Sequence, residues 1–126
     1  MKIQLQQQQV RVRIDEQELA QLFDAATLCS RSVFPGGVTW ALQLRLHAED
    51  SATLHVQAGD ILLALPQASV HELAQRLPCR DGVVFSLSGD GAPLTVHFDV
   101  DVRDSVRERG VVRGSTRAAG GRGAPA

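Results

Sequence analysis

The chain has 126 residues, of which 44% are hydrophobic and 21% are charged, and its formal net charge is −1. This size suits one domain, and the composition is that of a globular protein and not of a disordered one. A membrane protein, a small disulfide-framework protein and a multidomain enzyme are excluded, because no apolar run reaches roughly 18 residues and the chain has two cysteines.

The first strand pattern lies near the N-terminus, in MKIQLQQQQVRVRI. Residues 10–14 alternate valine or isoleucine with Arg11 and Arg13, which predicts a strand with one buried face. The apolar residues in 3–5 have the opposite parity, so the chain must bulge or turn within Gln6–Gln9. The early alternation also argues against a signal peptide or a transit sequence.

A helix is predicted directly after this strand. Asp15 and Glu18 have the spacing of a capping box, in which each side chain accepts a hydrogen bond from the other residue's backbone N–H. Its apolar stripe has three members: Leu19, Leu22 and Phe23.

Four strands follow in the middle of the chain. A strand at about 26–34 ends at a Pro-Gly-Gly turn signal, and 38–47 has the clearest alternation. Residues 52–57 and 61–65 predict two more strands around a turn at Gly59-Asp60. The run 61–65 is apolar on both faces, as in a strand that is buried on both sides.

The second half repeats the element order of the first. Ser69 and Glu72 have capping-box spacing before a second helix, and strands are predicted at 83–87 and 94–102. The two predicted helices share the sequence Glu-Leu-Ala-Gln. We therefore expect a pseudo-repeated strand-helix-strand-strand unit, with 52–57 as the link between the copies.

Seven or eight mostly antiparallel strands and two helices predict an α+β domain. Two helices are too few to cover both faces of a doubly wound sheet, so we expect one strongly curved sheet or an open barrel. The core should consist of Leu and Val, with four large aromatic members: Phe23, Trp40, Phe85 and Phe98.

The charge divides the chain into two parts. Residues 1–102 hold seven Lys/Arg and twelve Asp/Glu, a net charge of −5, whereas 103–126 hold six Arg and two acidic residues, a net charge of +4. The second part is rich in Gly, Ala and Arg, so it cannot bury enough apolar surface to order itself. We expect one domain at 1–102 and a largely disordered basic tail at 103–126. The tail could neutralise nucleic-acid phosphates, but it has no aromatic residue to stack on bases, which favours a solvated extension.

The opening of the chain combines Met1-Lys2-Ile3, an Arg-x-Arg strand at 10–14 and an acidic capped helix. This combination resembles a family of short bacterial proteins of unknown function, which typically open with an MKIRI-like strand, a Gly/Asn-type turn, an R-x-R strand and a T/S-x-x-E helix start. Gln6–Gln9 stand where that family places its turn residues, which argues against a tight first hairpin. The resemblance implies a bacterial cytoplasmic protein and supplies no catalytic or binding residue.

Six polar side chains alternate with predicted core positions and are the candidate ligand-binding residues: Arg11, Arg13, Arg45, His55, His97 and Asp99. If 38–47 and 52–57 pair across the turn at 49–51, Arg45 faces His55 and a cationic patch for phosphate or carboxylate results. The alternative is an ordinary outward face, on which an arginine pairs with Asp99 or Asp101.

His97, Asp99 and Asp101 share one face of the last predicted strand. Such groups can begin a metal site, but neighbours on one face lie about 6.6–7 Å apart at Cα, too far for one ion without ligands from other strands. We predict a solvated face there, no metal and no cofactor. Cys29 and Cys79 lack C-x-x-C spacing and are predicted to be free thiols without a redox role. We expect His71, near the start of the second helix, to point to solvent.

No assembled catalytic motif is present in the sequence, which favours a non-catalytic binding or protein-interaction module. Its partner surface would be an exposed sheet face or a sheet edge. Two alternatives stay open. One is a small enzyme or ligand-binding protein with a polar cationic pocket for an anionic small molecule, and the other is a nucleic-acid contact through the basic tail. The sequence identifies neither a partner nor an oligomeric state.

Overall fold

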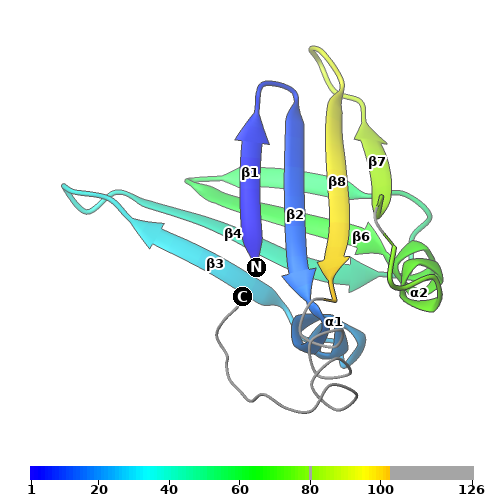
Figure 1. The fold of residues 1–126 in the computed structure, drawn as a ribbon. Coiled ribbons are helices and arrows are strands. Elements are labelled where there is room, and N and C mark those ends of the chain that lie inside the picture. The colour runs from blue at the N-terminus through cyan, green and yellow to red at the C-terminus, as the bar shows by residue number, and fades with distance from the viewer. Residues whose placement is uncertain (80, 103–126) are drawn as a thin grey trace, which may run out of the picture.

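A computed structural model describes residues 1–79 and 81–102 of the chain, so the predicted tail at 103–126 lies outside the described residues. Eight strands and two helices confirm the α+β prediction (Figure 1). In chain order they are β1 (Lys2–Gln6), β2 (Gln9–Asp15), α1 (Glu16–Phe23), β3 (Leu28–Val33), β4 (Thr39–His47), β5 (Thr53–Gln57), β6 (Asp60–Pro66), α2 (Gln67–Gln75), β7 (Val83–Leu87) and β8 (Leu94–Asp101).

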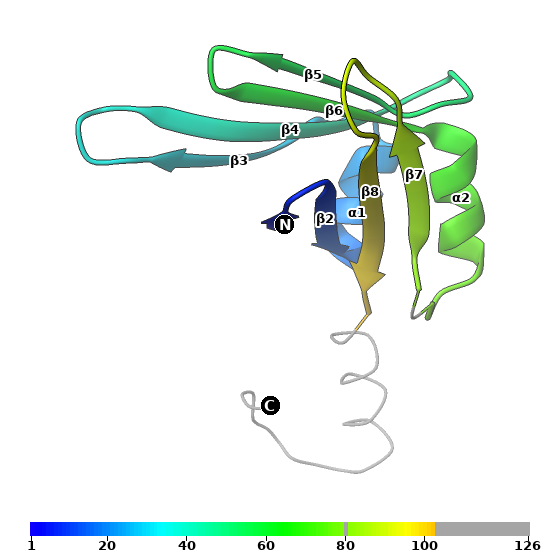
Figure 2. The ribbon, with the colours of Figure 1, turned by 90° about the horizontal axis from the view of Figure 1, so that it is seen from above.

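The strands form two four-stranded sheets. Sheet A has the order β1-β2-β8-β7, and sheet B has the order β3-β4-β6-β5. In each sheet two antiparallel hairpins meet through one parallel pair, which is β2 with β8 in sheet A and β4 with β6 in sheet B. The strands of sheet A run across those of sheet B in Figure 1, and Figure 2 shows the sheets as two separate layers.

The elements form a duplicated unit that is one strand longer than predicted. Each half consists of a hairpin, a helix and a second hairpin: β1-β2-α1-β3-β4 and then β5-β6-α2-β7-β8. Strand β5 is therefore the first strand of the second copy and not a link between copies. Each sheet takes one hairpin from each half, so exchanging the two halves exchanges sheet A with sheet B.

The two helices correspond in the core, but not through their shared sequence. From Glu16 to Gln67, the first residues of α1 and α2, the spacing is 51 residues. At this spacing Leu19 matches Val70 and Leu22 matches Leu73, and all four are buried. The Glu-Leu-Ala-Gln segments begin at positions 18 and 72 and are 54 residues apart, which is about one helical turn out of register.

The two helices begin in different ways. At α1 the predicted capping box is confirmed, since the Glu18 backbone N–H donates to Asp15 Oδ1 at 2.7 Å and the Asp15 N–H donates to Glu18 Oε1 at 3.0 Å. The predicted Ser69 box is wrong. Strand β6 runs directly into α2 through Pro66, which accepts no side-chain capping bond, so the helix begins two residues before Ser69.

The first hairpin is tight, contrary to the expectation drawn from its glutamines. Gln6 pairs with Gln9, and the loop between them has two residues, of which Gln7 has a φ of +48°. The equivalent hairpin β5–β6 has Ala58 at a φ of +52° in the same place. The left-handed backbone conformation of Gln7 costs about 1–2 kcal/mol. The five residue pairs of the β1–β2 ladder stabilise the hairpin by more than this cost.

The core lies between the two sheets. Fully buried side chains come from the central strands and both helices: Val12, Ile14, Leu22, Leu42, Leu44, Leu63, Leu65, Val70, Leu73, Val96 and Phe98. This confirms the predicted Leu and Val core. Of the four predicted aromatic members Phe98 is fully buried, and the other three are partly buried against the core.

Candidate functional site

Four of the six candidate residues lie together on the outer face of sheet A, the face that points away from the core. Arg11 and Arg13 of β2 alternate with buried valine and isoleucine, and His97 and Asp99 of β8 alternate with buried valine and phenylalanine. Strands β2 and β8 are parallel neighbours, and their register places Arg11 beside His97 and Arg13 beside Asp99.

The other two candidates, Arg45 and His55, lie on sheet B. The direct pairing of 38–47 with 52–57 that would make Arg45 face His55 does not occur, because β6 lies between β4 and β5. Arg45 has Ala64 as its neighbour on β6, and His55 has Leu62. Two strand spacings, about 10 Å, therefore separate the strands that carry Arg45 and His55, and the six candidates do not gather in one pocket.

Arg13 and Asp99 form a two-point ion pair. Arg13 Nε donates to Asp99 Oδ1 at 3.1 Å, and Nη2 donates to Oδ2 at 3.3 Å. The hydrogen bond with Asp99 and the charge of that carboxylate raise the pKa of the Arg13 guanidinium. The charge of Asp101 also raises this pKa, to a smaller extent. The outward-face interpretation, in which an arginine pairs with Asp99, is confirmed at this position.

Asp99 is buried, with 7% of its surface exposed, although it lies on the outer face. The loop before β7 covers it. Gly82 in this loop has a φ of +67°, and a Cβ there would overlap the Phe98 carbonyl oxygen and lie 2.7 Å from Asp99 Cβ. The absence of a side chain at Gly82 is therefore what allows the loop to lie so close over β8 and to shield the carboxylate from solvent.

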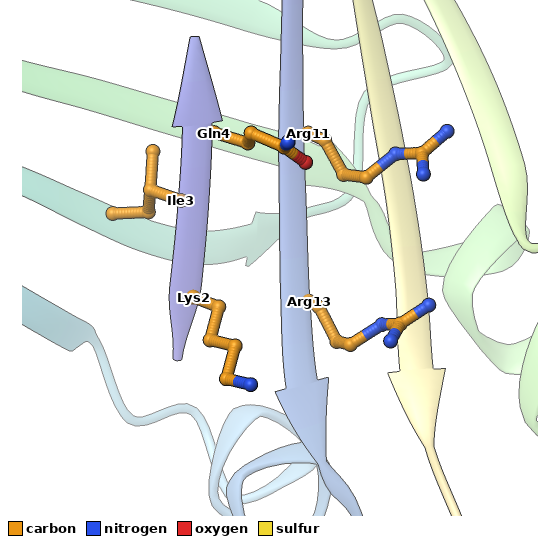
Figure 3. A pocket seen from close by; sticks show the side chains of 5 residues that line it. All are labelled: Lys2, Ile3, Gln4, Arg11 and Arg13. Carbon is orange, nitrogen blue, oxygen red and sulfur yellow. The ribbon is translucent and has the colours of Figure 1, made fainter.

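Strand β1 adds two side chains that sequence reasoning missed, Lys2 and Gln4. In the β1–β2 pairing Lys2 lies opposite Arg13, and Gln4 lies opposite Arg11. With Ile3, these four residues line a surface hollow of about 380 Å³. In Figure 3 the Lys2 side chain points from β1 toward β2, the Gln4 side chain reaches β2, and those of Arg11 and Arg13 extend from β2 over β8.

Two of the cations at this hollow are free. Lys2 and Arg11 are exposed, and the side chain of neither makes a hydrogen bond or ion pair with any part of the chain that the structure describes. Ammonium and guanidinium groups are the donors that bind carboxylate and phosphate oxygens in proteins. The Gln4 amide offers a further donor. The hollow therefore has the composition of an anion site.

The remaining candidate chemistry is sparse. Within residues 1–79 and 81–102 no group of three or more His, Cys, Asp and Glu is placed to hold a metal ion. Both cysteines are free; Cys29 is exposed on β3, and Cys79 accepts a hydrogen bond from Arg76 Nη1 at 3.2 Å. His71 is exposed, as predicted, and its ring stacks on that of Phe23 with the centroids 4.2 Å apart.

Comparison with known proteins places the chain without assigning it an activity. No curated protein and no solved structure matches it significantly. None of the described helices is long and apolar enough to cross a membrane. A family model with the description "Family of unknown function (DUF7009)" matches residues 1–101, from β1 to the end of β8. The chain therefore belongs to the DUF7009 family of unknown function.

Proposed function

We propose that the protein is a non-catalytic binding module that holds an anionic group on the outer face of sheet A. The observation that carries this proposal is the hollow at β1 and β2, where the free cations Lys2 and Arg11 lie next to Gln4 and Arg13. A carboxylate or phosphate there would accept hydrogen bonds from the ammonium group and the guanidinium group, and the Gln4 amide would provide a third donor.

The composition of the hollow favours binding over catalysis. Its lining consists of one lysine, one isoleucine, one glutamine and two arginines, without a carboxylate, histidine, serine or cysteine to act as a base or nucleophile. Asp99 lies next to it but is buried and held at both oxygens by Arg13. We therefore assign Asp99 a positioning role, in which it fixes the Arg13 guanidinium over β8.

Three other predictions rest on the sequence alone. A contact between the basic segment 103–126 and nucleic acid stays a prediction, because that segment lies outside the described residues. The domain boundary at residue 102 and a bacterial cytoplasmic origin also stay predictions. A small enzyme that uses all six candidate residues has no support from their placement, which divides them between the outer faces of two sheets.

Calorimetric titration of the full chain with inorganic phosphate and with citrate at low salt tests the anion site. We expect saturable binding to the wild type and about tenfold weaker binding to Arg11→Ala, because a hydrogen bond to a charged group contributes about 1.5–3 kcal/mol. Arg31→Ala is the matched control, since Arg31 is an exposed arginine on β3 of sheet B. Equal affinities for the two variants, or no binding to the wild type, would refute the proposal.

A further inference from the structure

Sheet B continues past the edge of sheet A. Strand β1 is the outermost strand of sheet A, and on its open side the hairpins β3–β4 and β5–β6 project further (Figures 1 and 2). The register places Val56 beside Ile61 on the face that turns toward the core, and Trp40 lies one step further along β4 on that face. Val56 is 66% exposed, while Trp40 and Ile61 are only partly buried. These three residues form an apolar floor next to the β1 edge.

The open edge of β1 presents unpaired backbone groups. In a hairpin with a two-residue loop the residues that flank the loop form a hydrogen-bonded pair, and such pairs then recur at every second residue. Gln6, Gln4 and Lys2 are therefore the residues bonded to β2. The N–H and C=O groups of Ile3 and Leu5 point away from β2, and they bond to no other described segment. Leu5 is also 58% exposed.

We propose that β1 accepts an extended segment of a protein partner as a fifth strand of sheet A, and that acidic and apolar residues alternate in this segment. Side chains on one face of such a strand would cover the apolar floor of Trp40, Val56 and Ile61. Those on the other face would lie beside Lys2 of the hollow, and their carboxylates would pair with its ammonium group. This inference rests on the proposed function, because it makes the acidic side chains the anions that Lys2 binds.

Charge excludes two other occupants. A second copy of the chain would offer β1 itself, whose sequence Lys-Ile-Gln-Leu-Gln contains no carboxylate. The segment 103–126 has a net charge of +4. Neither complements the Lys2 ammonium group, whereas a strand of alternating acidic and apolar residues would place carboxylates beside Lys2 and apolar side chains over the floor of Trp40, Val56 and Ile61.

Fluorescence anisotropy with a labelled peptide, Glu-Val-Glu-Ile-Glu-Val-Glu, tests the proposal on the full chain. We expect saturable binding, and at least about tenfold weaker binding for two control peptides. One control has lysine in place of each glutamate, and the other has the same composition with its three apolar residues together. Equal binding of the alternating and the block peptide would refute strand addition.

The backbone contribution is isolated by comparing two variants of one residue. Leu5→Pro removes the N–H that points to the open edge and leaves the β1–β2 ladder intact, since proline is tolerated on edge strands. Leu5→Ala keeps that N–H. We expect about tenfold weaker peptide binding for Leu5→Pro than for Leu5→Ala, and unchanged phosphate binding in both. If Leu5→Pro does not fold, Val56→Glu at the exposed floor replaces it, with the same expected loss.

The outcomes separate this inference from the proposed function. Phosphate binding without peptide binding, or equal peptide affinities of the two Leu5 variants, overturns strand addition alone. Loss of both ligands from the wild type overturns both proposals. A wild-type dimer in sedimentation velocity that Leu5→Pro converts to a monomer assigns the edge to a second copy and also overturns the proposed partner.

Discussion

The buried carboxylate of Asp99 forms an ion pair with Arg13. Both carboxylate oxygens are bonded to Arg13, and Gly82 closes the space above them. A buried carboxylate that loses its cation keeps the cost of desolvation without the gain of the ion pair. Loss of the partner should therefore cost more free energy when Asp99 is left alone than when Arg13 is left alone, because the Arg13 side chain is 42% exposed and can be solvated.

Arg13→Met should lower the free energy of unfolding by about 1–3 kcal/mol, because the carboxylate would then be buried without a charged donor. Urea unfolding followed by circular dichroism measures the loss. Arg11→Met is the matched control, since Arg11 lies two residues along the same face without an ion pair, and it should change stability by less than about 0.5 kcal/mol. Adding Asp99→Asn to Arg13→Met should recover part of the loss. Similar losses for the two arginine variants would contradict this account.

Among the elements, the two helices show how one position in a repeated unit can be filled differently. Asp15 and Pro66 occupy equivalent N-cap positions, but only Asp15 has a side chain that can accept a backbone N–H. Helix α2 begins without this bond, and Val70 and Leu73 are fully buried in the core. Burial of the apolar stripe therefore compensates for the missing cap, in line with the general dominance of packing over local helix signals.

Asp15→Ala should destabilise the protein by about 1 kcal/mol, since both bonds of the capping box are lost. Ser69→Ala is the matched control, because Ser69 has the same spacing to a glutamate but lies inside α2 and caps nothing. Its effect should be within about 0.5 kcal/mol of zero. Thermal or urea unfolding of both variants measures the difference. A loss of about 1 kcal/mol in Ser69→Ala as well would show that the cap assignment is wrong.

For the whole molecule, neither half of the chain holds a complete sheet. Sheet A joins β1–β2 to β7–β8, and sheet B joins β3–β4 to β5–β6. A chain divided after residue 51 should therefore give two fragments that do not fold as monomers. We expect narrow amide dispersion in NMR spectra of each fragment and a dispersed spectrum after mixing. A monomeric fragment 1–51 that unfolds cooperatively would contradict the interlocked topology.

Local patterns predicted the elements well, because their causes are local. Alternation in 38–47 and 94–102 predicted β4 and β8, since each strand buries one face. It also placed Arg11, Arg13, His97 and Asp99 on outward faces. Strand partners were not predictable in this way. Arg13 and Asp99 are 86 residues apart in sequence, and such pairing depends on non-local contacts that leave no mark on either strand alone.

The errors have identifiable physical reasons. Arg45 would face His55 only if their strands, which follow one another in the chain, were paired, but the parallel β4–β6 pair inserts a strand between them. Lys2 and Gln4 were missed because four glutamines do not signal a tight turn. Once Gln7 is accepted in a left-handed conformation, the parity of β1 is determined and both side chains fall on the same face as Arg11.

The two parallel pairs also set an order in which the sheets can be completed during synthesis. All strands of sheet B have been translated once β6 ends at Pro66, whereas sheet A lacks one of its two central strands until β8 ends at Asp101, about 35 residues later. Until then the nascent chain holds β1–β2 without the strand that joins it to β7. A ribosome that stalls before codon 94 would therefore carry a chain that contains every strand of sheet B but not every strand of sheet A.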